Sequence, residues 1–172
     1  SILPVVIYGM LDQFKSNVIR ICDIGGGLGS QYINLYLSLK LKNFEYTIIE
    51  LPMTANAGNL IFKSYSNIKF KSEFPVSTES FDFVYLGSSL QYFEDYEKII
   101  ETVCSYRPLK IVLTDLPMSR ARSFICAQVN MEKRAIPINV FNIEDIEIIF
   151  EKFGYNLNLI TKSFYPFHDL SN

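Results

Sequence analysis

The sequence predicts an α/β fold, a single Rossmann-like, doubly wound, mostly parallel sheet covered by helices. Strand-like and helix-like segments alternate along the chain, with no linker, repeat or low-complexity tract between them. A glycine-rich run at residues 25–29 stands between a strand-like and a helix-like segment, as in ligand-binding sheets of this class. The 172 residues are 49% hydrophobic and 20% charged, which predicts one globular domain over residues 1–172.

The first half of the chain contains three predicted strands and two predicted helices. Runs rich in β-branched and aromatic residues predict strands over 18–23, 44–50 and 68–70. Helices are predicted over 31–42 and 52–62. In the first of these helices, the apolar residues that recur at helical spacing and predict the buried face are Ile33, Tyr36, Leu37 and Leu41.

The second half begins with predicted strands over 81–86 and 110–113, separated by a helical pattern over 96–103. Asn142 is placed to cap a further helix, with Glu144 and Asp145 in its first turn and Gly154 at its end. Two final strands are predicted over 156–160 and 163–165.

Charge and rare residues exclude several functions. The net charge of −2 disfavours nucleic acid and anionic membranes, because both require a surplus of Lys and Arg. With His168 as the single histidine, a His-rich metal site and a Ser-His-Asp triad are not expected. Three dispersed cysteines predict reduced thiols and a cytoplasmic location, and the apolar stretch 3–10 is too short to cross a bilayer.

The glycine-rich run is preceded by an acidic residue, in the order Asp23-Ile24-Gly25-Gly26-Gly27-Leu28-Gly29. Counted from Gly25, the dinucleotide pattern G-x-G-x-x-G/A would place Ser30 at its last position, whereas D-x-G-x-G-x-G fits. The Asp23 carboxylate would repel a pyrophosphate and attract a cationic ligand. A tight turn without a ligand is the alternative interpretation.

A second acidic residue, Glu50, closes the second predicted strand, with Leu51 directly after it. A carboxylate in this place can accept hydrogen bonds from both hydroxyls of a ribose. Because NAD enzymes also use such an acid, Glu50 indicates a nucleoside without choosing the cofactor. A solvated charge at the end of a strand is the alternative.

Four segments together resemble one class I S-adenosylmethionine-dependent methyltransferase domain: ICDIGGGLGSQY, which resembles motif I, and then IIELP, FDFVYLGSSLQYFEDYEKII and PLKIVLTDLP. More narrowly, GGGLGSQY with SSLQYFED resembles a group of bacterial methyltransferases. The resemblance covers about residues 18–165. It implies S-adenosylmethionine as the cofactor and a seven-stranded sheet whose antiparallel last strand is 163–165. It also implies adenine near Glu73 and Phe74, and the methionine arm near Gly87, Ser88 and Ser89.

The resemblance predicts methyl transfer to a small-molecule or sugar-like acceptor. A hydroxyl acceptor would need a base, for which Asp115 and Tyr92 are candidates, although either residue could be structural. Metal-dependent O-methyltransferases carry an Asp at the end of the fourth strand. Here Gly87-Ser88 stands in that place, so no metal is expected. The absence of an Asn/Asp-Pro-Pro-Tyr motif argues against methylation of the amino groups of DNA bases.

Residues 118–142 are interpreted as an insertion that carries the acceptor side. Its basic residues are candidates for anion contacts but are more simply solvated surface; they are Arg120, Arg122, Lys133 and Arg134. Only 17 residues precede the first predicted strand, so we expect a missing N-terminal cap segment upstream of Ser1. The alternatives to a methyltransferase are a nicotinamide-dependent oxidoreductase and a cofactor-binding domain without activity. Neither the acceptor nor the oligomeric state is predicted.

Overall fold

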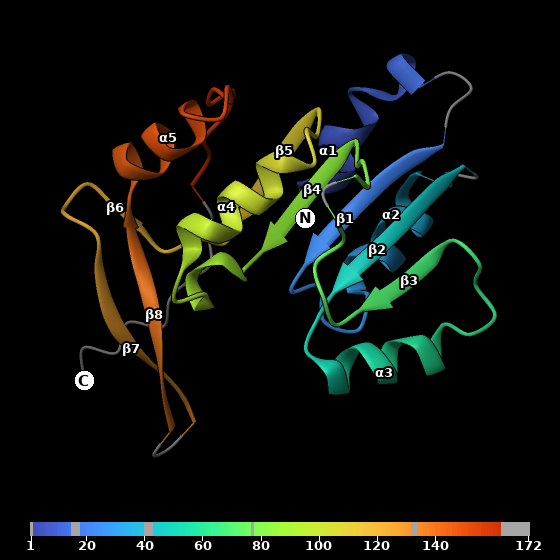
Figure 1. The fold of residues 1–172 in the computed structure, drawn as a ribbon, viewed down its shortest axis with the longest axis horizontal. Helices are drawn as coiled ribbons and strands as arrows, with labels where there is room; N and C mark the ends of the chain where they lie inside the picture. The colour runs from blue at the N-terminus through green and yellow to red at the C-terminus, as the bar shows by residue number, and fades with distance from the viewer. Residues whose placement is uncertain (1, 15–17, 40–42, 77, 132–133, 163–172) are drawn as a thin grey trace.

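The computed structural model describes residues 2–14, 18–39, 43–76, 78–131 and 134–162 (Figure 1). Its main sheet has the order β3-β2-β1-β4-β5, and all neighbouring strands are parallel. The strands are β1 (Ile19–Ile24), β2 (Phe44–Ile49), β3 (Ile68–Lys71), β4 (Phe83–Gly87) and β5 (Lys110–Thr114). The chain order reverses between β1 and β4, so the carboxyl ends of these two strands flank the crevice in which such sheets bind ligands.

Helices cover both faces of this sheet, as predicted. One core contains α1 (Leu3–Tyr8), α2 (Ser30–Leu39) and α3 (Pro52–Ile61), packed on side chains such as Ile21 and Tyr46. The other core contains α4 (Tyr96–Ser105) and α5 (Ile143–Glu151), packed on side chains such as Val84 and Leu86. Two 3₁₀ turns, η1 (Leu11–Phe14) and η2 (Leu90–Tyr92), complete the helical elements of the described chain.

The predicted buried face of α2 is wrong. The helix buries Tyr32 and Leu35, whereas Ile33, Tyr36 and Leu37 are 44–66% exposed. Leu41 lies outside the described residues. Apolar residues occupy more than one side of α2, so periodicity alone does not select the face. The Tyr32 ring determines the buried face, because it packs against the aromatic rings of Phe44, Tyr46 and Phe62 in the first core.

The predicted start of α5 is confirmed. The Asn142 side chain accepts hydrogen bonds from the backbone N–H of Glu144 (2.7 Å) and of Asp145 (3.1 Å). Gly154 has φ +82° and lies three residues beyond the last helical residue, Glu151. The helix therefore ends slightly earlier than the glycine indicated.

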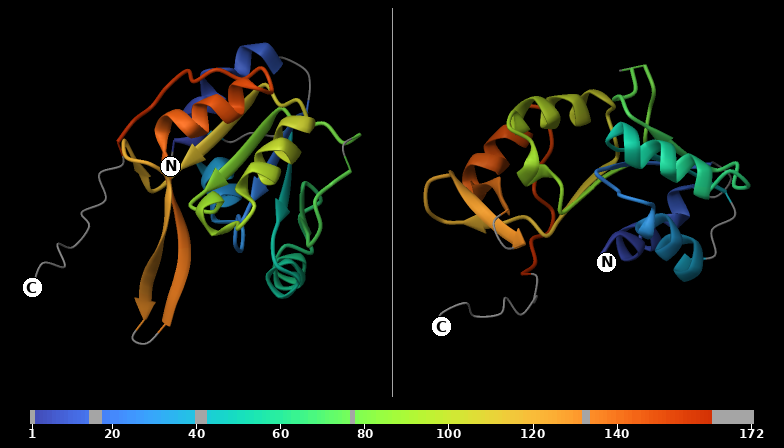
Figure 2. Two further views of the ribbon diagram at one scale, coloured as in Figure 1. Left: turned by 60° about the vertical axis from the view of Figure 1, so that its left-hand side comes forward. Right: turned by 90° about the horizontal axis from the view of Figure 1, so that it is seen from below.

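The predicted insertion at 118–142 contains β6 (Met118–Ser119), β7 (Phe124–Met131) and β8 (Arg134–Asn142). The last two form an antiparallel hairpin, and β6 adds a short parallel pairing to the base of β8. Figures 1 and 2 show this hairpin projecting away from the main sheet. These strands were not predicted from the sequence, and Pro137 inside β8 is unusual for a strand.

The strand predicted over 156–160 is wrong. These residues are irregular, and Leu157, Leu159 and Ile160 are each more than half exposed. A strand needs a backbone partner, and no described strand pairs with this segment. The antiparallel last strand expected at 163–165 lies outside the described residues.

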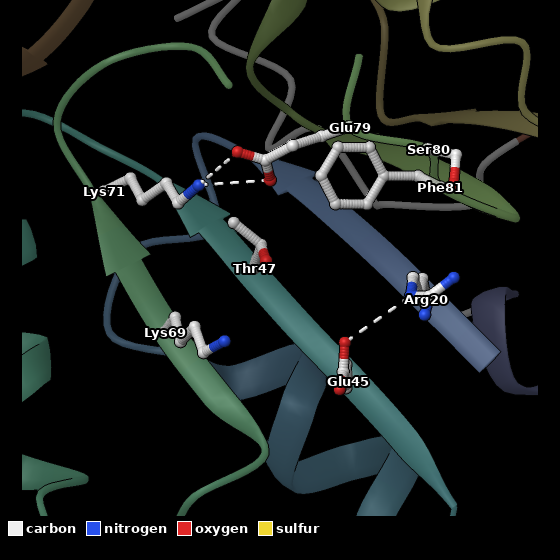
Figure 3. A pocket seen from close by; sticks show the side chains of 8 residues that line it. All are labelled: Arg20, Glu45, Thr47, Lys69, Lys71, Glu79, Ser80 and Phe81. Atoms are coloured by element: carbon white, nitrogen blue, oxygen red, sulfur yellow. Dashed lines mark hydrogen bonds and ion pairs between the residues drawn. The ribbon is translucent and has the colours of Figure 1, made fainter. Parts of the chain in front are cut away.

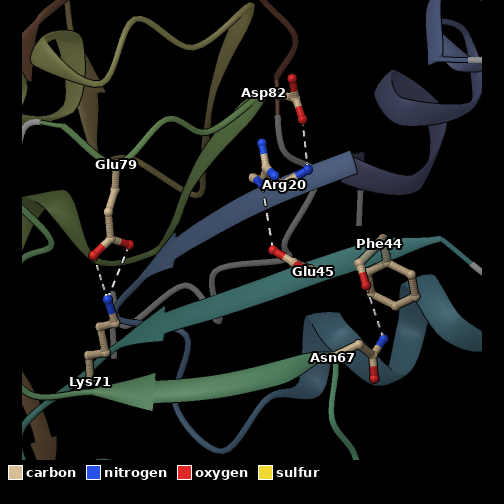
Figure 4. Close-up of polar contacts among 7 residues, drawn as sticks. All are labelled: Arg20, Phe44, Glu45, Asn67, Lys71, Glu79 and Asp82. Atoms are coloured by element: carbon tan, nitrogen blue, oxygen red, sulfur yellow. Dashed lines mark hydrogen bonds and ion pairs between the residues drawn. The ribbon is translucent and has the colours of Figure 1, made fainter. Parts of the chain in front are cut away.

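The connection from β3 to β4 contains no helix within 72–76 or 78–82. The sheet face beneath it is consequently open near the amino ends of β1 and β2, and Arg20, Glu45 and Lys69 project from three neighbouring strands there (Figure 3). They line a polar pocket of about 410 Å³. Two ion pairs form on this face, Arg20–Glu45 at 3.6 Å and Lys71–Glu79 at 2.8 Å (Figure 4).

Candidate functional site

The glycine loop joins β1 to α2 at the carboxyl edge of the main sheet. Gly25 has φ +74°, and a Cβ there would lie 2.5 Å from the Cβ of Ser89, in the loop after β4. A Cβ on Gly26 would lie 2.5 Å from a carboxylate oxygen of Asp23. Both positions therefore require glycine, Gly25 for its backbone conformation and both for close packing.

Asp23 lies behind this loop and is fully buried. The Tyr46 hydroxyl donates a hydrogen bond to Oδ2 at 2.8 Å, whereas Oδ1 has no partner among the described residues. Burial raises the pKa of Asp23 from 3.8 to about 7; the Tyr46 hydrogen bond opposes this shift and the Glu50 charge adds to it. The sequence placed the carboxylate beside the loop correctly but did not identify Tyr46 as its partner.

Glu50 follows β2 and links the glycine loop to the start of α3 through hydrogen bonds. Its Oε1 accepts from the Gly27 N–H at 3.0 Å, and its Oε2 accepts from the Leu51 N–H at 2.8 Å. Leu51 is the N-cap residue of α3 and is 73% exposed. The structure thus brings Glu50 to the glycine loop, at the end of the neighbouring strand.

The loop after β4 is joined to both neighbouring strands. The Ser89 hydroxyl donates to the Ile24 carbonyl at 2.6 Å, and the Ser88 N–H donates to the Thr114 carbonyl at 2.9 Å. Ser88 has φ +54°, which is uncommon for a residue with a side chain. The predicted residues Gly87, Ser88 and Ser89 therefore sit between the ends of β1 and β5.

Glu73 and Phe74 lie in the loop after β3, at the same edge. This loop and α3 enclose a pocket of about 420 Å³, whose walls include Ala55, Asn56 and Asn59 of the helix. Phe74 is partly buried and packs against the second core, whereas Glu73 is exposed. The pocket offers an aromatic ring and several amide and carboxylate groups, which suits a flat, polar heterocycle.

The two candidate bases are placed differently. Tyr92 is 44% exposed, and its hydroxyl donates to the Gln128 side-chain oxygen of β7 at 2.8 Å. Asp115 directly follows β5, with φ +55°. Of the candidate anion contacts, Arg120, Arg122 and Arg134 are exposed, and Lys133 lies outside the described residues.

Three buried side-chain oxygens lack a hydrogen-bond partner in the described part of the chain: Oδ1 of Asp23, Oε1 of Gln31 and Oε1 of Gln91. Asp23 lies behind the glycine loop, Gln31 is the second residue of α2, and Gln91 lies in the loop after β4. All three atoms are acceptors, and native proteins leave few such atoms unsatisfied. A ligand with N–H donors at this edge would complement them.

No group of three or more potential metal-binding side chains occurs among the described residues. Within the same residues, no helix has the length and apolar character needed to span a bilayer.

No protein-family model and no curated protein matches the chain. Several solved structures do match. The chain is 12% identical to 1,6-didemethyltoxoflavin-N1-methyltransferase from Burkholderia thailandensis, with a TM-score of 0.63, covering 89% of this chain and 65% of that one. It is 11% identical to a candidate sarcosine dimethylglycine methyltransferase from Galdieria sulphuraria, with a TM-score of 0.60 and coverages of 90% and 61%. For magnesium protoporphyrin IX methyltransferase from Synechocystis PCC 6803 the identity is 15%, the TM-score 0.58 and the coverages 90% and 72%.

These matches establish the fold. The chain has the class I methyltransferase fold, as the sequence predicted, and spans 61–65% of the length of the Galdieria and Burkholderia proteins. The Burkholderia and Synechocystis structures hold S-adenosylhomocysteine.

Proposed function

We propose that the chain binds S-adenosylmethionine at the carboxyl edge of the main sheet and transfers its methyl group to a small-molecule acceptor. The observation that carries this proposal is the buried Asp23 carboxyl behind the glycine loop, with one oxygen lacking a partner in the described chain. A pyrophosphate at this loop would meet Asp23 and the nearby Glu50, and like charges about 4 Å apart repel by about 4 kcal/mol at intermediate dielectric. A cofactor with an ammonium and a sulfonium suits both carboxylates.

Each part of this cofactor has a candidate site. The glycine loop and the start of α2 would hold the amino-acid end, because unpaired N–H groups at a helix start bind a carboxylate. Glu50 would accept the ribose hydroxyls, next to Leu51. The pocket beside Glu73 and Phe74 would hold the adenine.

The methyl group would leave the cofactor near the loop after β4, where Gly87, Ser88 and Ser89 form the proposed wall of the methionine arm. The sulfonium supplies an activated methyl group, so alignment of the acceptor can provide much of the rate. A hydroxyl acceptor would also lose a proton, and Tyr92 or Asp115 would be the base. We infer a small or sugar-like acceptor.

Calorimetry with two ligands tests the cofactor. The protein is expected to bind S-adenosylhomocysteine and not NAD. Tight binding of NAD without binding of S-adenosylhomocysteine would instead identify a nicotinamide-dependent oxidoreductase.

Mass spectrometry of small molecules that co-purify with the protein tests the acceptor. Incubation with methyl-labelled S-adenosylmethionine then tests turnover on any candidate found. Cofactor binding without methyl transfer to any co-purifying compound would favour a binding domain without activity.

A further inference from the structure

Strand β7 presents a long edge that pairs with no strand of the described chain except β8. The two strands form the hairpin that projects from the main sheet (Figure 2). In an antiparallel pair only alternate residues bond to the partner strand, so the remaining N–H and C=O groups of β7 point outward. On the opposite side of the hairpin, β6 pairs with the base of β8. The hairpin therefore presents the whole length of β7 as an open edge.

β7 lacks the features that normally prevent an edge strand from pairing with another chain. Such strands are usually very short or carry lysine or proline. The other edge strands of the described chain have these features: β3 has four residues with two lysines, β5 has five with one lysine, and β6 has two residues. The eight residues of β7, Phe124–Met131, include no charged residue, proline or glycine. The composition of β7 thus permits a pairing that the other edges oppose.

Apolar side chains of β7 are exposed beside this edge. Ile125 and Val129 are 69% and 68% exposed, and Ala127 between them is also exposed. These three residues share one face of the hairpin, because alternate residues of a strand point to the same side. Phe124, on the other face, is half exposed. A strand added along the edge would contact these side chains on both faces.

We propose that β7 pairs antiparallel with β7 of a second copy of the chain, so that two hairpins form one four-stranded sheet. A second copy fits this edge because a two-fold axis brings like residues together, and an uncharged strand meets its own copy without repulsion. The order of the joined strands would be β8-β7-β7-β8. Since each copy contributes one β7 edge, the assembly closes at a dimer. The pairing is independent of the cofactor and of methyl transfer.

Sedimentation velocity of the ligand-free protein over a range of concentrations tests this assembly. The wild type should change from monomer to dimer as the concentration rises, with a dissociation constant of roughly micromolar order, because one pair of strands is a small interface. Ala127→Lys should weaken the dimer by about 5-fold or more, since it brings two positive charges together near the two-fold axis.

Ala135→Lys is the matched control. Ala135 is exposed and lies opposite Val129, on the same face of the hairpin as Ala127 but on β8. It would therefore lie in an outer strand of the four-stranded sheet, away from the two-fold axis. The same substitution at this position should leave the monomer–dimer equilibrium unchanged.

Cys126 of β7 allows a second measurement on the unmodified chain. Cys22 and Cys104 are buried, whereas Cys126 is partly exposed. With the two-fold axis at residue 126, 127 or 128, the two copies of Cys126 lie at most four residues apart along the paired strands, about 14 Å at 3.4 Å per residue. A flexible bismaleimide of that length should give covalent dimers in the wild type and in Ala135→Lys, fewer in Ala127→Lys, and none in Cys126→Ser.

Several results would overturn the pairing. One is a protein that stays monomeric at every concentration at which it is soluble; if that monomer binds S-adenosylhomocysteine, the proposed function still stands. Equal weakening by Ala127→Lys and Ala135→Lys would indicate that the faces of two hairpins pack together instead. A dimer that Ala127→Lys does not weaken, or that gives no cross-link through Cys126, would place the contact elsewhere. Assemblies larger than a dimer would contradict closure by a two-fold axis.

Discussion

Replacing Asp23 with Asn removes the charge of this buried side chain and nearly preserves its shape. The Tyr46 hydroxyl can still donate to the side-chain oxygen, as it donates to Asp23 at 2.8 Å. The main change is that the folded protein no longer contains a buried group that must ionise as the pH rises. The variant therefore isolates the effect of desolvation on this carboxyl.

The size and sign of the effect follow from the pKa of Asp23, which burial raises from 3.8 to about 7. Between these values the folded protein keeps the proton that the unfolded chain releases. The stability of the wild-type protein should therefore fall as the pH rises from about 4 to about 7 and level off above. At 1.36 kcal/mol per pKa unit, the wild type should lose roughly 2.5 kcal/mol relative to Asp23→Asn between pH 5 and pH 8.

Urea unfolding at several pH values between 5 and 8 measures this difference without any ligand. Asp12→Asn is the control, because Asp12 is an exposed carboxylate in η1. Its stability difference from the wild type should stay nearly constant over this range. A constant difference for Asp23→Asn as well would show that the folded protein accommodates the charge, and the electrostatic reasoning would be wrong.

Four further outcomes are expected. S-adenosylhomocysteine should bind more tightly as the pH rises through about 7, because its ammonium favours ionised Asp23; calorimetry that finds the same pH dependence in Asp23→Asn would contradict this. Glu50→Ala should weaken that binding by roughly 1.5–3 kcal/mol, as a charge-assisted hydrogen-bond pair is lost, and unchanged affinity in the folded variant would place the ribose elsewhere. Gly26→Ala should destabilise the protein by about 1–3 kcal/mol, because its Cβ would clash with Asp23. Adding Asp23→Ala to this variant should restore the lost stability. Nothing lies within 4 Å of a Cβ at position 27, so Asp23→Ala should not restore the stability of Gly27→Ala in the same urea measurements. Methyl transfer, once an acceptor is known, should survive excess EDTA, and activity that magnesium restores would refute a metal-independent reaction.

The sequence predicted the main sheet well because its strands are short runs of β-branched and aromatic residues separated by helical patterns. It also located the glycine loop and Glu50, since residues that follow parallel strands meet at one edge. The hydrogen-bond partner of Asp23 was not predictable, because Tyr46 and Asp23 are 23 residues apart. Nothing in the local pattern of either residue indicates such a contact. The face of α2 was missed because apolar residues occupy more than one side of that helix.

The connection from β3 to β4, which has no helix within its described residues, has a consequence for local stability. β3 is a four-residue edge strand that presents one face to the polar pocket, whereas α3 packs against its other face. A short strand at the edge of a sheet opens at lower free energy than a central strand, so amide hydrogens of β3 should exchange before those of β1. The loop after β3 carries Glu73 and Phe74, the residues proposed to meet the adenine. A ligand bound there would hold the end of this edge strand in place and slow its exchange.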